Sequence, residues 1–417
     1  MKMLVLSCAV LTLSPAAVAE WNQFRGPEGT GVAEAALVPA VPTQKDITWT
    51  ATLPGKGHSS PIAWGEKVFV TAEDGTKSGV RYVLCYSAKD GKELWRYEDQ
   101  FEAYPQHELN SYTSSTPAAD ARRLYLSWLS GTERRVLALD HNGKKAWEKT
   151  LGFYREQHGS SASPIIVDGL LIVPNDHANK KDAGIYALDA ATGAIKWKFE
   201  TTSDKTAFST PTLIKAPDGK KQLIISSQPA ALTALDPATG KKLWEVSKPV
   251  SEARAVSSPV WAQGIIVATV GQGGAGRGAV AVKAGSSDGK VKPEVVWEAS
   301  SRIPYVPTAV AFGPNLYFLG DGGILSCVKS ATGEHVWDER GPGKAYSSPI
   351  CINGLLYTLS RDGKLLVARA GEKFEPLGEL ALGEECQTTP AVAAGRLIVR
   401  TNTKLIGIGG APSAEKP

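Results

Sequence analysis

Charged side chains recur at one place in this sequence, five residues before a proline that opens an apolar segment. Two other groups that could bind a ligand stand three residues before such a proline, and one histidine stands six before. The candidates are Lys56, His58, His158, Arg254, Arg302, Lys344, Tyr346 and Glu385. If these segments converge, the basic groups would form a funnel for an anionic ligand or an acidic peptide, because guanidinium and ammonium groups bind oxyanions. The alternative interpretation is that they are solvated loop residues.

Other motifs with possible chemistry have simpler explanations. Residues 271–276 match a dinucleotide-binding loop, but the strand-forming run 280–282 follows where that motif needs a helix, so we predict a hairpin loop. The six histidines show no metal-ligand spacing. A loop metal site stays open around Asp176 and His177, although a solvated turn is favoured. We therefore predict no catalytic residue and no metal site, and an enzyme is the less favoured reading.

A repeat positions these residues. Two small polar residues and a proline precede an apolar strand, a Gly or Asp turn and another apolar strand, and copies follow one another at intervals of 41 to 56 residues. We expect the hydroxyls before each proline to hydrogen-bond local backbone. A repeat of this length with all-β content is typical of a propeller. The anchoring residues are Pro61, Pro117, Pro164, Pro211, Pro259, Pro307, Pro349 and Pro390.

A second signature interleaves with the first, as in the segment 234–244, where a turn with Asp236 and Gly240 leads to Trp244. The last repeat lacks the strand that carries the tryptophan. The predicted strand 47–53 carries Trp49 but belongs to no complete repeat. We predict that these pair and close a single ring, an all-β, eight-bladed propeller over residues 47–410 with four antiparallel strands per blade. The predicted blade-docking residues are Trp49, Trp95, Trp147, Trp197, Trp244, Trp297 and Trp337.

The chain starts with a charged residue, an apolar run and small residues at 17–19, the pattern of a secretory signal peptide cleaved after Ala19. We expect an irregular arm over 20–46 anchored by Trp21 and Phe24, a disordered tail over 411–417, and a periplasmic or secreted monomer without a membrane span.

The net charge of +4 does not suggest a nucleic-acid partner. Cys351 and Cys386 could form a disulfide, whereas Cys85 and Cys327 are expected to be buried.

The proline-anchored strands and the Ala-Leu-Asp-x-x-Thr-Gly-x-x-x-Trp hairpin resemble the PQQ-like β-propeller repeat family. The resemblance implies either a BamB-like scaffold that binds another envelope protein, or a quinoprotein dehydrogenase with PQQ and calcium. The dehydrogenases carry adjacent cysteines, and this sequence has none. We therefore expect a non-catalytic binding or assembly scaffold without a cofactor, with a PQQ-binding protein or quinone-dependent dehydrogenase as the alternative.

Overall fold

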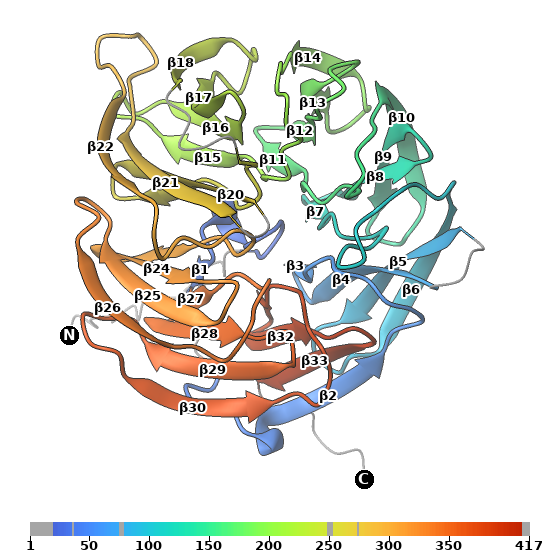
Figure 1. Cartoon of the computed structure of the whole chain (residues 1–417). Helices are drawn as coiled ribbons and strands as arrows, with labels where there is room; N and C mark the ends of the chain where they lie inside the picture. Colours follow the sequence, from blue (N-terminus) through green and yellow to red (C-terminus); the bar gives the residue numbers. More distant parts are fainter. Residues whose placement is uncertain (1–19, 36, 75–78, 248–252, 273–274, 411–417) are drawn as a thin grey trace, which may run out of the picture.

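This computed structural model describes residues 20–35, 37–74, 79–247, 253–272 and 275–410. The predicted signal peptide and C-terminal tail lie outside the described residues. Eight sheets stand around a common axis (Figure 1). Each contains four antiparallel strands, and the sheet of blade 7 gains a fifth strand, β1, which pairs in parallel with β27. The third strand of blade 4, β17, is buried along its whole length, because both of its faces pack against neighbouring sheets. Outer strands such as β6 alternate between covered and exposed residues.

The first four blades follow one another without interruption. Blade 1 contains β3 (Ile62–Trp64), β4 (Lys67–Glu73), β5 (Val80–Ser87) and β6 (Glu93–Gln100). Blade 2 contains β7 (Ala118–Ala119), β8 (Arg123–Ser130), β9 (Glu133–Asp140) and β10 (Lys145–Phe153). Blade 3 contains β11 (Ile165–Val167), β12 (Leu170–Asn175), β13 (Gly184–Asp189) and β14 (Ile195–Phe199). Blade 4 contains β15 (Thr212–Lys215), β16 (Lys221–Ser227), β17 (Ala230–Leu235) and β18 (Lys242–Val246).

The remaining blades complete the ring. Blade 5 contains β19 (Val260–Ala262), β20 (Ile265–Gln272), β21 (Ala275–Lys283) and β22 (Glu294–Ala299). Blade 6 contains β23 (Val310–Phe312), β24 (Asn315–Leu319), β25 (Ile324–Lys329) and β26 (His335–Arg340). Blade 7 contains β27 (Ile350–Ile352), β28 (Leu355–Leu359), β29 (Lys364–Arg369) and β30 (Pro376–Ala381). Blade 8 contains β31 (Ala391–Ala393), β32 (Arg396–Arg400), β33 (Lys404–Gly409) and β2 (Ile47–Thr52).

The ring closes between the two ends of the chain. β2 pairs antiparallel with β33, and Trp49 stands opposite Gly407. This pairing supplies the outer strand that the last repeat lacks, so the predicted eight-bladed propeller and its mode of closure are confirmed. No helix among the described residues is long and apolar enough to cross a membrane.

A tryptophan on the outer strand of a blade packs on the turn of the next blade. The indole N–H donates to a backbone carbonyl there at 2.9–3.1 Å in six of the seven cases. The indole of Trp244 donates instead to Gln222 Oε1, and the Gln222 amide donates onward to the Gly285 carbonyl of blade 5. A methyl group on Gly143 would lie 2.7 Å from the Trp95 ring, so the turn accepts no side chain.

Blade 7 departs from this arrangement. Gly378, opposite Val367, occupies the place that tryptophan holds in the other blades. The Val41 side chain of the N-terminal arm fills the adjoining space, since it lies 2.5 Å from where a Cβ on Gly378 would stand. Leu37 of the arm packs in the same way against Gly395 of blade 8. The arm therefore supplies the apolar packing that a tryptophan supplies elsewhere.

Hydroxyl groups link the blades near the axis. Two residues before an inner strand, a hydroxyl side chain accepts a hydrogen bond from the equivalent backbone N–H of the preceding blade. Seven such links of 3.0 or 3.1 Å are present among the eight blades. The members of this hydroxyl ring are Ser60, Thr116, Ser163, Thr210, Ser258, Thr308, Ser348 and Thr389. The prediction that the hydroxyls before each proline bind local backbone is wrong for this ring, because its N–H partners belong to the neighbouring blade. It holds for the preceding residues Ser59 and Thr388, which bond to the backbone of Thr71 and Arg400 in their own blades.

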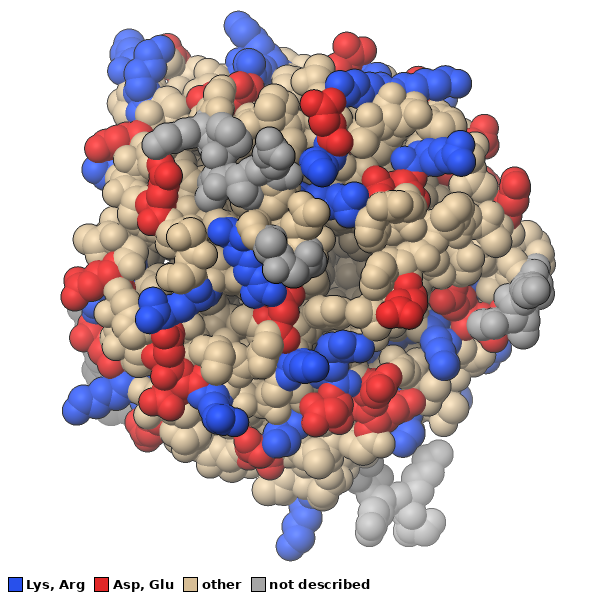
Figure 2. Space-filling view, in the orientation of Figure 1, with Lys and Arg blue, Asp and Glu red and all other residues tan. Residues whose placement is uncertain are grey.

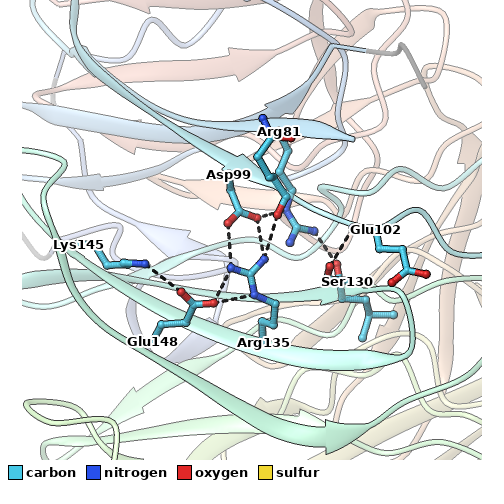
Figure 3. Close-up of polar contacts among 9 residues, drawn as sticks. Arg81, Asp99, Glu102, Ser130, Arg135, Lys145 and Glu148 are labelled. Carbon is cyan, nitrogen blue, oxygen red and sulfur yellow. Dashed lines mark hydrogen bonds and ion pairs between the residues drawn. The ribbon is translucent and has the colours of Figure 1, made fainter. Parts of the chain in front are cut away.

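An ion-pair network joins blades 1 and 2 at the ends of β5, β6 and β9 (Figure 3). Asp99, which is 4% exposed, accepts from Arg81 at 2.9 Å and from Arg135 at 3.1 Å. Glu148 continues the network outward to Lys145. Because Arg81 is fully buried, Asp99 provides the charge that makes its burial tolerable.

The described cysteines are free and buried. Cys351 packs with Tyr317 between blades 6 and 7, whereas Cys386 donates to the Arg400 carbonyl of blade 8. The possible Cys351–Cys386 disulfide is therefore absent, because the two thiols lie in different blade interfaces. Burial raises the pKa of Cys351 to about 12 and that of Cys386 to about 11, so both thiols are protonated near neutral pH.

Candidate binding site

A cavity of about 770 Å³ lies on the propeller axis, and every blade contributes to its wall. We call it the funnel. The hydroxyl ring lies at its inner end, and the residues two positions earlier in each blade form a second ring above it. The members of this wall ring are His58, Ser114, Ser161, Phe208, Val256, Val306, Tyr346 and Gln387. The ring places side chains from all eight blades around one space.

The N-terminal arm closes the inner end of the funnel. The carbonyls of Trp21 and Asn22 accept hydrogen bonds from the inner strands of blades 1 and 2, and β1 (Val32–Ala33) pairs in parallel with β27 of blade 7. Phe24 forms part of the lining. The first part of the arm thus turns an axial channel into a blind cavity. The arm also contains the 3₁₀ helices η1 (Pro27–Gly29) and η2 (Gln44–Asp46), and η2 lies beside the outer strand β30 of blade 7.

Arg25 fixes the arm in place. Its guanidinium group is 1% exposed and donates to the carbonyls of Thr308, Ala309 and Pro349, on blades 6 and 7. Burial lowers the pKa of Arg25 to about 9, and the carbonyls supply the acceptors that its charge needs.

The structure brings five of the eight predicted site residues to the funnel, namely His58, His158, Arg254, Lys344 and Tyr346. Lys56 and Glu385 are exposed and do not line it. Arg302 also lies outside and pairs with Asp338, its side chain half exposed. Of the four cations predicted to form the funnel, Lys56 and Arg302 are therefore outside it, and Arg254 and Lys344 line it.

A register shift in blade 6 explains the position of Arg302. Thr308 is the hydroxyl-ring member there and Val310 begins the inner strand, so Ala309 occupies the place of the anchoring proline. Pro307, the anchor taken from the sequence, stands two residues too early. Val306 is consequently the wall-ring residue, and Arg302 falls outside the wall.

Three cations that the proline pattern missed also line the funnel: Lys205, Arg277 and Arg361. Arg277 lies on β21, four residues before Ala281, which stands opposite Trp297. Arg81 and Arg134 hold the same position in blades 1 and 2, so the third-strand repeat carried a signal for Arg277. Figure 2 shows the hollow near the middle of one face, with Lys and Arg side chains around it.

One side of the funnel holds a linked basic group. Glu156, 8% exposed, accepts from His158 Nδ1 at 2.9 Å and lies 3.6 Å from the Arg254 guanidinium. Burial alone would raise the pKa of Glu156, but hydrogen bonds from His158 and Thr206 and the Arg254 charge hold it below its usual value. The ring of His107 stacks on His158 with centroids 5.7 Å apart. Arg254 is therefore held in position by an ionised carboxylate.

The opposite side is arranged around blade 7. The Arg361 guanidinium lies 4.9 Å from the centre of the Tyr346 ring, and its buried Nε has no hydrogen-bond partner among the described residues. The Arg361 backbone N–H donates to the Lys344 carbonyl, which keeps the two cations adjacent. Burial, and then the charges of Arg400 and Arg361, lower the pKa of His58 to about 4, so His58 is neutral near pH 7.

The donor groups of the funnel do not fit a calcium-bound quinone. Asp321 is the carboxylate among the described lining residues, and it already accepts from the N–H groups of Tyr305 and Val306 and pairs with Arg277. The four described cysteines are absent from the lining. Over the described ranges, no cluster of three His, Cys, Asp or Glu side chains is placed to hold a metal ion.

The two other motifs are also placed. Gln272 of β20 pairs with Ala275 of β21, so the glycine-rich segment is a hairpin, as predicted. Asp176 and His177 are buried, and the predicted solvated turn is wrong there. Asp176 accepts from Thr201 and Ser227, and burial raises its pKa to about 6. His177 bonds to the Phe153 carbonyl and packs on Tyr154.

Comparison with known proteins places this geometry in a family. The family model described as outer membrane protein assembly factor BamB matches residues 32–126 and 80–298, well over half of the chain. The chain belongs to this family. It is also 23% identical over 380 residues to the outer membrane protein assembly factor BamB of Burkholderia pseudomallei, covering 85% of this chain and 84% of that protein.

Similarity to quinoproteins is more local in sequence. The chain is 29% identical over 127 residues to quinohemoprotein alcohol dehydrogenase ADH IIB of Pseudomonas putida, covering 28% of this chain and 17% of the dehydrogenase. Among solved structures, BamB of Moraxella catarrhalis has a TM-score of 0.61 at 16% identity and covers 88% of this chain and 98% of its own. Quinohemoprotein alcohol dehydrogenase of Comamonas testosteroni has a TM-score of 0.65 at 14% identity, covering 96% and 82%. These structures share the propeller fold.

Proposed function

We propose that this BamB-family chain is an exported, non-catalytic scaffold that binds another protein of the cell envelope, and that its basic funnel holds an anionic ligand or an acidic peptide segment. The observation that carries the scaffold role is the 380-residue similarity to the assembly factor BamB, which extends over most of both proteins. The partner class is taken from that relative's name. The funnel role rests on the cations of blades 4, 5 and 7.

Cross-linking in the native host tests the scaffold role. The full-length chain, tagged at its C-terminus, is expressed at its natural level, cross-linked in cells and analysed by mass spectrometry. We expect cross-links to a component of the outer-membrane protein assembly machinery. A chain that cross-links to no envelope protein, while envelope controls in the same cells do, would contradict the scaffold role.

A PQQ-binding protein or quinone-dependent dehydrogenase is the second candidate function, favoured by the 127-residue similarity to a quinohemoprotein alcohol dehydrogenase. The test is a titration of the purified protein with PQQ and calcium, followed by absorbance and by dye-linked alcohol oxidation. We expect no calcium-dependent change in absorbance and no alcohol oxidation, because the carboxylate in the lining that could bind calcium is already engaged by N–H groups and Arg277.

A further inference from the structure

The charge of the funnel is unbalanced. Five cations, Lys205, Arg254, Arg277, Lys344 and Arg361, face one carboxylate, Asp321, within the described lining. Arg277 is paired with that carboxylate, and Arg254 is held by the buried Glu156. In the described part of the chain, Lys205, Lys344 and Arg361 have no ion-pair partner. The funnel thus keeps positive charge that the protein does not neutralise.

One of these charges, that of Arg361, lies over an aromatic ring of the lining. Going from blade 5 to blade 7, Arg254 is followed by Tyr305, Tyr346 and Arg361 in the lining. The Tyr305 ring rests on the backbone of Gly271, where a Cβ would approach it to 2.5 Å. The Arg361 guanidinium lies over Tyr346. A guanidinium group held by a ring loses less freedom when it binds an anion than a free side chain does.

The closed inner end limits what can enter. The arm blocks passage along the axis, and a volume of about 770 Å³ is in the range of small-molecule sites. At that end the hydroxyl ring provides neutral hydrogen-bonding groups. An extended peptide would have to enter and leave by the same mouth, whereas a compact molecule is enclosed on all sides but one.

We propose that the funnel binds a compact small-molecule anion with two or more negative charges, held between Arg254 on blade 5 and the Lys344–Arg361 pair on blade 7. Carboxylate and phosphate groups share the chemistry that these cations recognise. This inference rests on the funnel role proposed above and selects the small ligand over the acidic peptide.

The experiment is isothermal titration calorimetry of the purified protein with citrate, inorganic pyrophosphate and a glutamate-rich peptide as separate probes. We expect citrate or pyrophosphate to bind one per chain, with an affinity that falls as sodium chloride is added. The variant Lys344→Ala/Arg361→Ala should weaken binding by about tenfold or more, because it removes two charged donors. Whichever of the two anions binds more tightly identifies the carboxylate or the phosphate source.

Arg302→Ala is the matched control, because Arg302 lies near the funnel in sequence but outside its lining. It should bind the anion as the natural protein does. Thermal unfolding verifies that each variant is folded, and Lys344→Ala alone, at an exposed residue, serves if the double variant unfolds.

Three results would overturn the proposal: binding of neither anion at millimolar concentration, equal affinity in the Lys344→Ala/Arg361→Ala and Arg302→Ala variants, or binding of the peptide in place of both anions. Cross-linking of the natural chain to its envelope partner tests the scaffold role independently of anion binding. Retained cross-links without anion binding would reject the funnel ligand alone.

Discussion

The rim and the centre of this propeller use the internal repeat in opposite ways. At the rim, a tryptophan on the outer strand packs on the next blade's turn in seven of the interfaces. In the wall ring, equivalent positions hold imidazole, hydroxyl, phenyl, isopropyl, phenol and amide side chains. Because the blades repeat one backbone arrangement, the two regions differ in the role of the side chain. At the rim the side chain packs one blade on the next, and in the wall ring it faces the funnel.

This contrast supplies a control within one chain. A residue type that recurs at the same position in each blade is needed for the fold. A position at which the residue type varies between blades is not constrained by the fold. We therefore expect changes at the rim to lower stability without altering anion binding, and changes at the funnel cations Lys344 and Arg361 to do the reverse. The predictions below test this separation.

The largest effect is expected for Trp244→Ala. The Trp244 side chain is 7% exposed and packs between blades 4 and 5, so its removal should lower the free energy of unfolding by roughly 4 kcal/mol. Urea denaturation measures this change, and titration of the still-folded variant with citrate should show unchanged affinity. Lys242→Ala, an exposed change on the same strand, is the control. Equal stability of the two variants would show that the tryptophan at the rim is not needed for stability.

Asp99→Asn tests whether an unrepeated residue can still be structural. Asp99 neutralises the fully buried Arg81, so the amide should cost roughly 3 kcal/mol of unfolding free energy by leaving that charge unpaired. Glu148→Gln, at the more exposed end of the same network, should cost less than about 1 kcal/mol. Chemical denaturation of both variants gives the comparison. A loss no greater for Asp99→Asn than for Glu148→Gln would show that variation between blades does mark positions free of structural demand.

Thr116→Val removes one acceptor from the hydroxyl ring while keeping the shape of the side chain. The buried N–H of Ser60 then loses its partner, which should lower the unfolding free energy by about 1–2 kcal/mol. Thermal or urea unfolding detects this, with Thr202→Val, at an exposed loop residue, as the control. If Thr116→Val were as stable as the natural chain, the ring would belong to the binding surface and not to the fold.

The smallest effect concerns His58 and pH. Its pKa is about 4 in the folded chain and about 6.5 when unfolded, so the unfolded state binds more protons between these values and stability falls as the pH drops through this window. Between pH 7 and pH 6 the expected loss is about 0.7 kcal/mol. His58→Gln should remove this part of the pH dependence in urea titrations at the two pH values. An unchanged slope in the variant would show that His58 titrates normally.

Much of the architecture was predictable because it is repeated. The Trp49 strand could be assigned to the last blade because the repeat had one strand missing at one end and one spare at the other. Blade 6 was placed two residues out of register because Pro307 imitates the anchor that Ala309 replaces. The arm has no periodicity, so nothing in the sequence indicated that β1 would pair with β27 or that Arg25 would reach blades 6 and 7.

The candidate site was partly predictable for the same reason. His58, Arg254, Lys344 and Tyr346 follow from their distance to the inner strand, which the repeat fixes. Lys205 stands six residues before Pro211, as His158 stands six residues before Pro164, so the repeat also carried a signal for Lys205. Arg361 lies in the turn between β28 and β29, away from the proline anchors, and its position at the axis depends on loop geometry that a sequence pattern does not encode.

Closure of the ring by β2 also sets an order of events during synthesis. β2 is synthesised near the start of the chain, whereas its partner β33 is synthesised near the end. Thr48, for example, contacts the carbonyl of Gly407, which is 359 residues later in the chain. The entropic cost of closing a loop grows only with the logarithm of its length, so closure over this distance costs little more free energy than closure of a much shorter loop. The arm likewise cannot pair with β27 until blade 7 exists. A chain halted before blade 7 lacks both the β1–β27 pairing and the Lys344–Arg361 side of the funnel, so anion binding would report only molecules in which blade 7 has been made.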